Sequence, residues 1–325
     1  MKKVVITQRL HEAGMQVLAG KADVKITNNG NPKEIVGELS DAEGLIIRIG
    51  SIDRETIMAS KKLRVIGRPG VGVDNVDMAA ATERGIPVVI APGANTRSVA
   101  EHALTLIMAS AKDLLRNDQQ TRSGNFNIRN SFKAFELQGK TLGLIGYGNI
   151  GRELALLSSA IGLNIMVYDP FVTRESIEQQ GYCYETDMDC VLCGADVISL
   201  HVPLTEKTRN MIGARELAMM KPSTVLINCA RGEIVDEAAL YTALSEGKIH
   251  SAATDVLVVE PVKPDHPLLQ LDNFIITPHM AGLTQEAAAG VCIMAAEGVL
   301  AVLNGEKWPH VANKAVYDHP TWQGK

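Results

Sequence analysis

Residues 146–151 read Gly-Tyr-Gly-Asn-Ile-Gly and therefore have the spacing G-x-G-x-x-G. Gly146 permits a tight turn, Gly148 lets the backbone approach a pyrophosphate, and Gly151 allows a helix to pack closely on a strand. Asn149 and Ile150 would begin that helix, whose first N–H groups can receive phosphate charge. The spacing alone is weak, because glycine is common in turns, so the prediction depends on the flanking residues.

The flanking residues fit a dinucleotide site. An apolar run at 141–146 leads into the glycines, an apolar helical pattern at 150–161 follows, and a second strand-like run at 164–168 ends at Asp169. Asp169 lies 18 residues after Gly151, where a carboxylate can accept hydrogen bonds from ribose hydroxyls. Because a carboxylate repels a 2′-phosphate, we expect NAD rather than NADP, although nearby Arg174 leaves NADP open.

Three charged residues follow strand-like runs further along the chain. Arg231 follows 224–228, Glu260 follows 251–255, and His279 follows 274–277. Ligands gather at the carboxyl ends of the strands in open parallel sheets, so these side chains can converge on one ligand. Taken singly, each has an equally good structural explanation: a turn cap, a solvated acid and a residue that follows a proline. Together with a dinucleotide turn, they favour an active site.

The elements that must position these residues form two alternating series of short β-rich runs and helical patterns. The first has strands at 3–7, 44–48, 64–67 and 88–90, with helices at 53–59 and 75–84 between them. A helix at 98–115, with Ser98 as its cap, and a polar stretch at 116–130 precede the second series. Its strands lie at 141–146, 164–168, 197–200, 224–228, 251–255 and 274–277, and a helix at 285–304 closes the chain. The pattern predicts an α/β protein with two doubly wound parallel sheets.

Composition limits the class of protein. The 325 residues are 46% hydrophobic and 21% charged, with a net charge of −5, which indicates a soluble globular protein without a broad nucleic-acid-binding surface. We expect no membrane-spanning segment, and the short apolar run near Met1 predicts a cytoplasmic protein without a secretory signal. The five cysteines are too few for a disulfide scaffold, and Cys190-x-x-Cys193 is interpreted as reduced thiols, with no metal site.

Several sequence blocks resemble the D-isomer-specific 2-hydroxyacid dehydrogenase family over nearly the full chain. They are GRPGVGVDNVD at 67–77, NTRSVAE at 95–101, GKTLGLIG at 139–146, HVPLT at 201–205, NCARG at 228–232 and PH at 278–279. The first two blocks are most similar to phosphoglycerate dehydrogenases. The resemblance implies a Rossmann NAD-binding domain, at 98–286, inserted into a flavodoxin-like substrate domain, at 1–97 plus 287–325. It also implies a homodimer formed largely through the nucleotide-binding domains.

The resemblance also implies roles for matching residues. His279 would be the acid/base, Glu260 would orient its imidazole and favour the charged form, and Arg231 would bind the substrate carboxylate. The backbone N–H groups of Val71, Gly72 and Val73 would hold the same carboxylate. Asp255 would receive the nicotinamide carboxamide of NAD. The residues placed around NAD are Gly146, Gly148, Asn149, Ile150, Gly151, Asp169, Val202, Cys229, Ala230, Asp255, Ala281 and Gly282.

The substrate remains open between several small 2-hydroxy or 2-oxo acids. Arg48 and Arg68 match basic residues near the substrate phosphate of phosphoglycerate dehydrogenases, but Ile49-Gly50-Ser51 departs from the usual polar residues there, and Val71 replaces a common threonine. A sulfonate, a second carboxylate or a simple 2-oxo acid is equally compatible, as in sulfolactate, hydroxypyruvate/glyoxylate or D-lactate enzymes. The sequence also leaves open the family branches that use phosphite or formate, and an NAD-sensing binding protein similar to corepressors. Because the chain ends at Lys325, we expect no serine feedback control.

Overall fold

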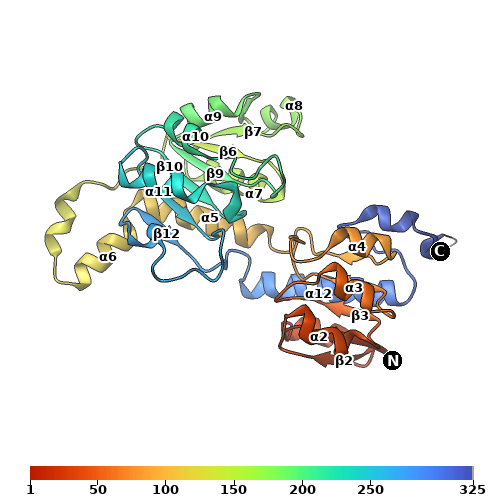
Figure 1. Ribbon diagram of the computed structural model, residues 1–325. Coiled ribbons are helices and arrows are strands. Elements are labelled where there is room, and N and C mark those ends of the chain that lie inside the picture. Colours follow the sequence, from red (N-terminus) through yellow and green to blue (C-terminus); the bar gives the residue numbers. More distant parts are fainter. Residues whose placement is uncertain (324–325) are drawn as a thin grey trace. The chain divides into compact units, whose positions relative to one another are not determined.

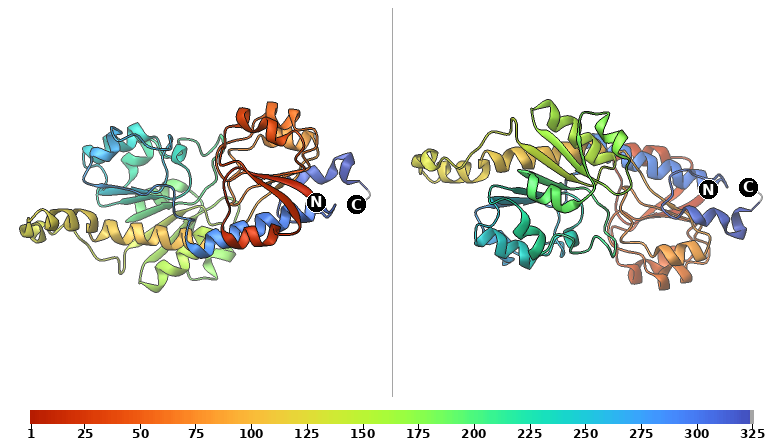
Figure 2. Two further views of the ribbon diagram at one scale, coloured as in Figure 1. Left: turned by 90° about the horizontal axis from the view of Figure 1, so that it is seen from below. Right: turned by 90° about the horizontal axis from the view of Figure 1, so that it is seen from above.

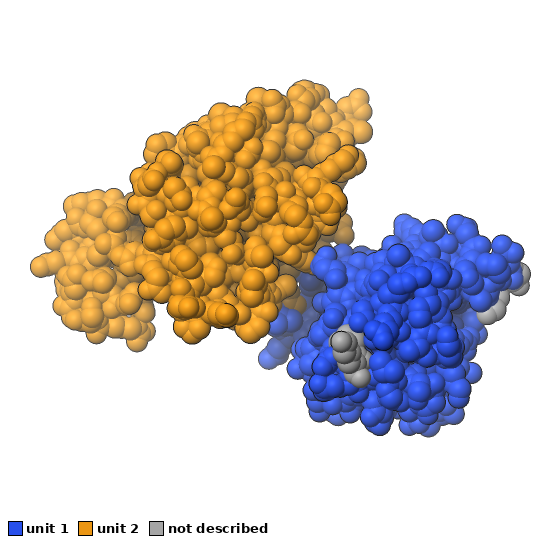
Figure 3. All heavy atoms as spheres, in the orientation of Figure 1, with its two compact units in different colours: residues 1–95, 283–325 blue, residues 96–282 orange. Residues whose placement is uncertain are grey.

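The computed structural model describes residues 1–323, which divide into two compact units (Figure 3). Of the described residues, unit 1 contains 1–95 and 283–323, and unit 2 contains 96–282. The divisions fall where helices begin, because helix α5 starts at Thr96 and Thr284 caps helix α12. The boundaries expected from the sequence, 97/98 and 286/287, lie a few residues further along the chain.

Unit 1 is built on a five-stranded parallel sheet with the order β2-β1-β3-β4-β5. This order is that of flavodoxin-like folds, as the sequence predicted. Helices α1 and α12 lie side by side on one face, and α2, α3 and α4 cover the other (Figures 1 and 2). The elements are β1 (Lys2–Ile6), α1 (Glu12–Leu18), β2 (Ala22–Ile26), α2 (Pro32–Leu39), β3 (Gly44–Ile46), α3 (Arg54–Ala59), β4 (Val65–Gly67), α4 (Met78–Glu83), β5 (Val88–Val89), α12 (Gln285–Leu303), η4 (Lys314–Asp318) and η5 (Pro320–Trp322).

Helix α12 is the closing helix that the sequence predicted at 285–304, and it is strongly apolar. It is long and apolar enough to cross a membrane, with 19 residues and a mean hydropathy of 1.8. Half of this apolar stretch is buried inside the structure, and α12 packs against strands β3, β4 and β5. Its buried residues include Val291, Ala295 and Val299, which belong to the core of unit 1. Its apolar character is therefore accounted for by core packing.

Unit 2 is built on a seven-stranded parallel sheet with the order β12-β11-β10-β9-β6-β7-β8. Helices α5, α7 and α8 pack on one face, and α9, α10 and α11 on the other. The strand order reverses at β6, which pairs with both β7 and β9, and ligands bind at such a switch point. The elements are α5 (Thr96–Ala111), α6 (Leu114–Arg122), η1 (Phe126–Ser131), β6 (Thr141–Ile145), α7 (Asn149–Ala160), β7 (Asn164–Tyr168), α8 (Arg174–Glu178), β8 (Cys183–Glu185), α9 (Met188–Gly194), β9 (Val197–Leu200), α10 (Ala214–Met219), β10 (Val225–Asn228), η2 (Gly232–Ile234), α11 (Glu237–Ser245), β11 (Ser251–Thr254), η3 (Pro267–Gln270) and β12 (Phe274–Ile276).

The predicted fold class is confirmed, and the local differences lie mainly around α5 and α6. Ser98 does not cap α5, because the helix begins at Thr96 and Ser98 is buried within it. The predicted helix at 98–115 is interrupted at Asp113, whose left-handed φ of 47° starts a new helix. That helix, α6, occupies the stretch expected to be merely polar. It has no buried residue, so no apolar stripe indicated it in the sequence.

Candidate active site

The glycine turn of unit 2 joins β6 to α7 at the switch point of the sheet (Figure 1). Gly146 has a φ of +100°, and a Cβ there would lie 2.7 Å from the carbonyl carbon of His201 and 3.1 Å from the nitrogen of Val202. A Cβ at Gly151 would lie 2.4 Å from the oxygen of Gly146. These two glycines are required by close packing, and Val202 lies directly behind the turn.

Gly148 has a different part in the turn. A Cβ at this position would meet no atom within 4 Å, so the fold itself does not exclude a side chain. Gly148 is the N-cap of α7 and offers no side chain to the first amides, which include those of Asn149 and Ile150. The open space and these amides form a cradle of the kind that accepts a pyrophosphate at a helix N-terminus. The residues present therefore fit the phosphates of NAD.

Asp169 follows β7 and turns its carboxylate toward the glycine turn. Its Oδ2 accepts a hydrogen bond from the amide of Tyr147 at 2.7 Å, and its Oδ1 accepts one from the amide of Phe171 at 2.8 Å. Both bonds fix the carboxylate beside the cradle, where a ribose would lie. Arg174 is engaged elsewhere, in an ion pair with Glu178 at 2.9 Å and over the ring of Tyr184. This arrangement favours a ribose without a 2′-phosphate.

The turn after β10 carries Cys229, Ala230 and Arg231. The buried side chain of Asn228 fixes it, because Oδ1 accepts from the amide of Ala230 at 3.0 Å and Nδ2 donates to the Arg231 carbonyl at 2.8 Å. A Cβ at Gly232 would lie 2.1 Å from the carbonyl carbon of Leu257, so the turn packs directly on the loop that leads to Glu260. Arg231 and Glu260 therefore come from two loops that touch.

Burial raises the pKa of the Cys229 thiol, and the nearby carboxylate of Asp255 raises it further. The thiol is therefore protonated at neutral pH, and a protonated thiol is a poor nucleophile. Cys229 forms part of the wall beside Arg231.

Glu260 and His279 meet at the carboxyl edge of the same sheet. The Glu260 carboxylate accepts a hydrogen bond from Nδ1 of His279 at 2.7 Å, and its other oxygen accepts from the Leu257 amide at 3.1 Å. Because a carboxylate only accepts, Nδ1 carries a hydrogen and Nε2 is the nitrogen left for proton exchange. The His279 side chain is 51% exposed and that of Glu260 is 38% exposed, so the imidazole is accessible to a reactant.

Asp255 organises the backbone that carries His279. Its carboxylate is 1% exposed, and it accepts hydrogen bonds from the amides of Met280 at 2.9 Å and Ala281 at 2.8 Å. Its carbonyl oxygen accepts from the amide of His279 at 2.8 Å. The predicted residues Asp255, Glu260, His279 and Ala281 are thus joined by direct contacts, and Gly282 follows as the last residue of unit 2.

Two further residues join this group without having been predicted. The hydroxyl of Thr277 donates to Asp255, and Nε2 of His102 lies 2.9 Å from the same hydroxyl. His102 lies on α5, far from Thr277 in the sequence, so no spacing rule connects them. The only signal in the sequence was the place of Thr277 at the end of a strand-like run, two residues before His279.

Unit 1 gathers its own predicted residues at the carboxyl edge of its sheet. Arg48 and Arg68 follow the neighbouring parallel strands β3 and β4. The Arg48 guanidinium donates to the Arg9 carbonyl at 2.8 Å, and Nε of Arg68 donates to Asn75 at 3.2 Å. The loop that holds Val71, Gly72 and Val73 follows directly, with Val71 exposed. Two basic side chains and a glycine-rich loop therefore share one edge.

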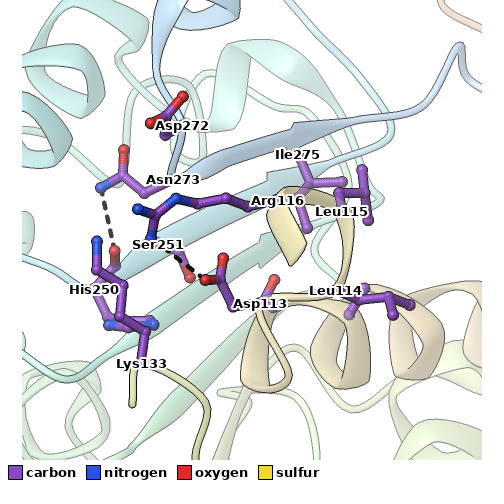
Figure 4. A pocket seen from close by; sticks show the side chains of 12 residues that line it. Asp113, Leu114, Leu115, Arg116, Lys133, His250, Ser251, Asp272, Asn273 and Ile275 are labelled. Carbon is purple, nitrogen blue, oxygen red and sulfur yellow. Dashed lines mark hydrogen bonds and ion pairs between the residues drawn. The ribbon is translucent and has the colours of Figure 1, made fainter. Parts of the chain in front are cut away.

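A cavity of about 310 Å³ in unit 2 lies away from these residues (Figure 4). Its lining includes His250 and Ser251 before and at the start of β11, and Asp272 and Asn273 before β12. These positions are at the amino ends of strands whose carboxyl ends lead to Asp255 and His279. The cavity is therefore not part of the candidate active site. Within residues 1–323, no cluster of His, Cys, Asp and Glu could hold a metal ion, and all five cysteines are free.

The geometry of unit 2 defines a doubly wound dinucleotide-binding domain, with a glycine cradle, the carboxylate of Asp169 beside it and a histidine–glutamate pair on one sheet edge. A family model described as "D-isomer specific 2-hydroxyacid dehydrogenase, NAD binding domain" matches residues 104–281. The chain belongs to the D-isomer specific 2-hydroxyacid dehydrogenase family. The resemblance inferred from the sequence and the prediction of NAD as cofactor are confirmed.

Individual relatives extend the match to nearly the whole chain. A D-3-phosphoglycerate dehydrogenase of Methanocaldococcus jannaschii is 43% identical over 96% of this chain, which spans 60% of that relative's length. A glyoxylate reductase of Korarchaeum cryptofilum is 35% identical over 97% of this chain and 96% of its own length. The crystal structure of D-lactate dehydrogenase with NAD+ from Lactobacillus jensenii has a TM-score of 0.78 and 30% identity, covering 96% of this chain and 99% of its own.

Proposed function

We propose that this protein is an NAD-dependent oxidoreductase that interconverts a D-2-hydroxy acid and its 2-oxo acid by hydride transfer. The observation that carries the proposal is the His279–Glu260 pair at 2.7 Å, on the sheet that also bears the glycine cradle and Asp169. Acid–base chemistry and a dinucleotide site on one sheet edge are what hydride transfer to a ketone requires. Membership in the family gives the reaction class.

Each residue has a proposed role in the reduction. NAD, when bound as NADH, supplies the hydride, and the cradle at Gly148 with Asp169 holds its phosphate and ribose ends. His279 donates the proton from Nε2 to the carbonyl oxygen of the 2-oxo acid, and Glu260 stabilises the charged imidazole that precedes this transfer. Arg231 binds the substrate carboxylate, since a planar guanidinium can pair with both of its oxygens. The reverse reaction returns the proton to Nε2.

Unit 1 is proposed as the substrate domain. Amides of Val71, Gly72 and Val73 would bind the substrate carboxylate, and Arg48 and Arg68 would bind an anionic tail. The shared sheet edge of the two arginines supports this role. Similarity to D-3-phosphoglycerate dehydrogenases makes a phosphorylated tail the first candidate. A glyoxylate reductase relative keeps small neutral-tailed acids as the second.

The test is the rate of NADH oxidation with a panel of 2-oxo acids: phosphohydroxypyruvate, sulfopyruvate, hydroxypyruvate, glyoxylate and pyruvate. We expect turnover that His279→Ala reduces by about 10³-fold or more, while the surface control Glu246→Gln retains it. A strong preference for a phosphorylated or sulfonated acid that Arg48→Ala abolishes would support the anionic tail. Tight NADH binding without turnover of any acid would contradict the function and favour an NAD-sensing binding protein.

We propose a homodimer that forms through unit 2. The segment of α6 and η1 exposes four large apolar side chains, those of Leu114, Leu115, Phe126 and Phe132. A second copy would remove them from water, which is favourable in proportion to the apolar area buried. Light scattering of the wild type should give twice the chain mass, and the variant Phe126→Glu with Phe132→Glu should give the monomer.

We also propose a cytoplasmic protein. The support is that all five cysteines are free thiols, as expected in a reducing compartment. Fractionation of the source cells, followed by immunodetection, would test this location.

A further inference from the structure

Three side chains of unit 2 form a chain of hydrogen bonds behind the His279 backbone. Nε2 of His102, on α5, lies 2.9 Å from Oγ1 of Thr277, and this hydroxyl contacts Oδ1 of Asp255. Nε2 of His102 is also 3.6 Å from that carboxylate oxygen. The His102 side chain is 16% exposed and the Asp255 side chain 1%, so water competes little for these bonds.

The direction of each bond follows from the number of protons that each group carries. The Asp255 carboxylate can only accept, so the single hydroxyl proton of Thr277 is donated to it. Oγ1 of Thr277 must then accept from His102, and Nε2 of His102 therefore carries a hydrogen. The two hydrogen bonds therefore point in one direction, from the imidazole to the hydroxyl and from the hydroxyl to the carboxylate.

The end of this chain fixes the peptides around His279. Oδ1 of Asp255 also accepts from the Met280 amide at 2.9 Å, and Oδ2 accepts from the Ala281 amide at 2.8 Å. His279 directly precedes Met280 and has a left-handed φ of 53°, which non-glycine residues seldom adopt. Such a conformation persists only when the surroundings hold it, and the Asp255 carboxylate supplies part of that hold.

We propose that His102 is a positioning residue for the reaction. Through Thr277 it sets the orientation of the Asp255 carboxylate, which in turn holds the backbone of His279 and, in the proposed function, would receive the nicotinamide carboxamide. This inference rests on the proposed function, in which His279 exchanges the proton. His102 itself touches neither substrate nor cofactor in this role.

The kinetic test compares variants that break and restore the chain. His102→Leu removes the donor and Thr277→Val removes the relay, whereas His102→Gln and Thr277→Ser keep a polar group at each position. We expect kcat to fall about tenfold in the first two, with a change in KM for the 2-oxo acid below about twofold. The conservative variants should recover most of kcat. Thr105→Val, an exposed threonine of α5 whose hydroxyl donates only to the Glu101 carbonyl, is the matched control and should retain wild-type values.

The double variant His102→Leu/Thr277→Val distinguishes positioning from two separate structural losses. Because the two groups act through one carboxylate, the double variant should lose no more kcat than either single variant. Losses that multiply, or wild-type kcat in folded His102→Leu, would overturn the proposal. If His102→Leu does not fold, the comparison of kcat between Thr277→Val and Thr277→Ser takes its place. Wild-type kcat in Thr277→Val would then overturn the proposal.

A binding measurement separates this inference from the proposed function. The dissociation constant of NADH should rise about tenfold in His102→Leu, while that of ADP-ribose, which lacks the nicotinamide, should stay unchanged. An equal loss for both ligands, or no loss for either, would refute the positioning role. This comparison needs no turnover, so it decides the matter even if the wild type reduces none of the 2-oxo acids and the proposed function fails.

Discussion

Replacing Glu260 by Gln removes one negative charge from the pair that it forms with His279 and leaves the shape of the side chain almost unchanged. Glutamine can still accept a neutral hydrogen bond from Nδ1, so the imidazole keeps its orientation. What is lost is the stabilisation of the charged imidazole, which is the form that donates a proton during reduction.

The structure sets the size of this loss. A hydrogen bond to a charged group is worth about 1.5–3 kcal/mol when it is well shielded. Here the side chain of His279 is 51% exposed and that of Glu260 is 38% exposed, so solvent screening reduces that value. A loss of about 1–1.5 kcal/mol corresponds to a fall in kcat/KM of about tenfold.

The assay is NADH oxidation with the best 2-oxo acid, followed at several pH values for the wild type and Glu260→Gln. Glu246→Gln, an exposed glutamate paired only with Lys248, is the control for loss of a surface charge. A rate within twofold of the wild type would show that Glu260 does not act on the charged imidazole. A loss above about 10³-fold would show that it does more than stabilise and orient His279, and would equally refute the reasoning.

Three further predictions concern particular contacts. Gly148→Ala should leave the free energy of unfolding nearly unchanged, because a Cβ there meets nothing within 4 Å, yet it should weaken NADH binding at least tenfold. Gly151→Ala should instead destabilise the fold by about 1–3 kcal/mol, because its Cβ would lie 2.4 Å from a backbone oxygen. Urea unfolding measures the stability of each variant, and fluorescence titration measures its affinity for NADH. Equal losses of stability and affinity in both variants would contradict a phosphate-binding role for the cradle at Gly148. Burial lowers the pKa of His201 from its ordinary 6.5 to about 4. The unfolded chain therefore binds a proton at this residue before the folded protein does, and the free energy of unfolding should fall by about 2–3 kcal/mol as the pH drops from above 6.5 to 4. His201→Asn should remove that part of the acid sensitivity, and an unchanged pH dependence of unfolding in the variant would contradict this prediction. Iodoacetamide at pH 8 should label exposed Cys193 well before Cys229, whose pKa burial raises, and early labelling of Cys229 by mass spectrometry would contradict its protonated state.

The sequence predicted the sheet architecture because buried parallel strands leave a strong local signal. Runs such as 141–146 and 197–200 are apolar on both faces and bounded by turn residues, so they correspond closely to β6 and β9. The edge strands β2 and β8 were missed for the opposite reason. Residues 22–26 contain Asp23 and Lys25 on an edge, and 183–185 is only three residues long, so neither forms an apolar run.

The candidate site was predicted as far as it depends on strand ends. Glu260 and His279 were placed together because both follow neighbouring parallel strands, and their 2.7 Å contact fits that placement. His102 and Thr277 were not predicted, because a contact between α5 and the end of β12 depends on how the helix crosses the sheet. No periodicity or spacing in the sequence carries that information.

The most direct test of the proposed reaction is the fate of the hydride. The wild-type protein is incubated with NADH deuterated at C4 of the nicotinamide and with the best 2-oxo acid, and the product is analysed by mass spectrometry after chiral separation. Hydride transfer with His279 as the acid predicts a D-2-hydroxy acid with one deuterium at C2, formed far more slowly by His279→Ala. A product without deuterium, a product of L configuration, or no product at all would contradict it.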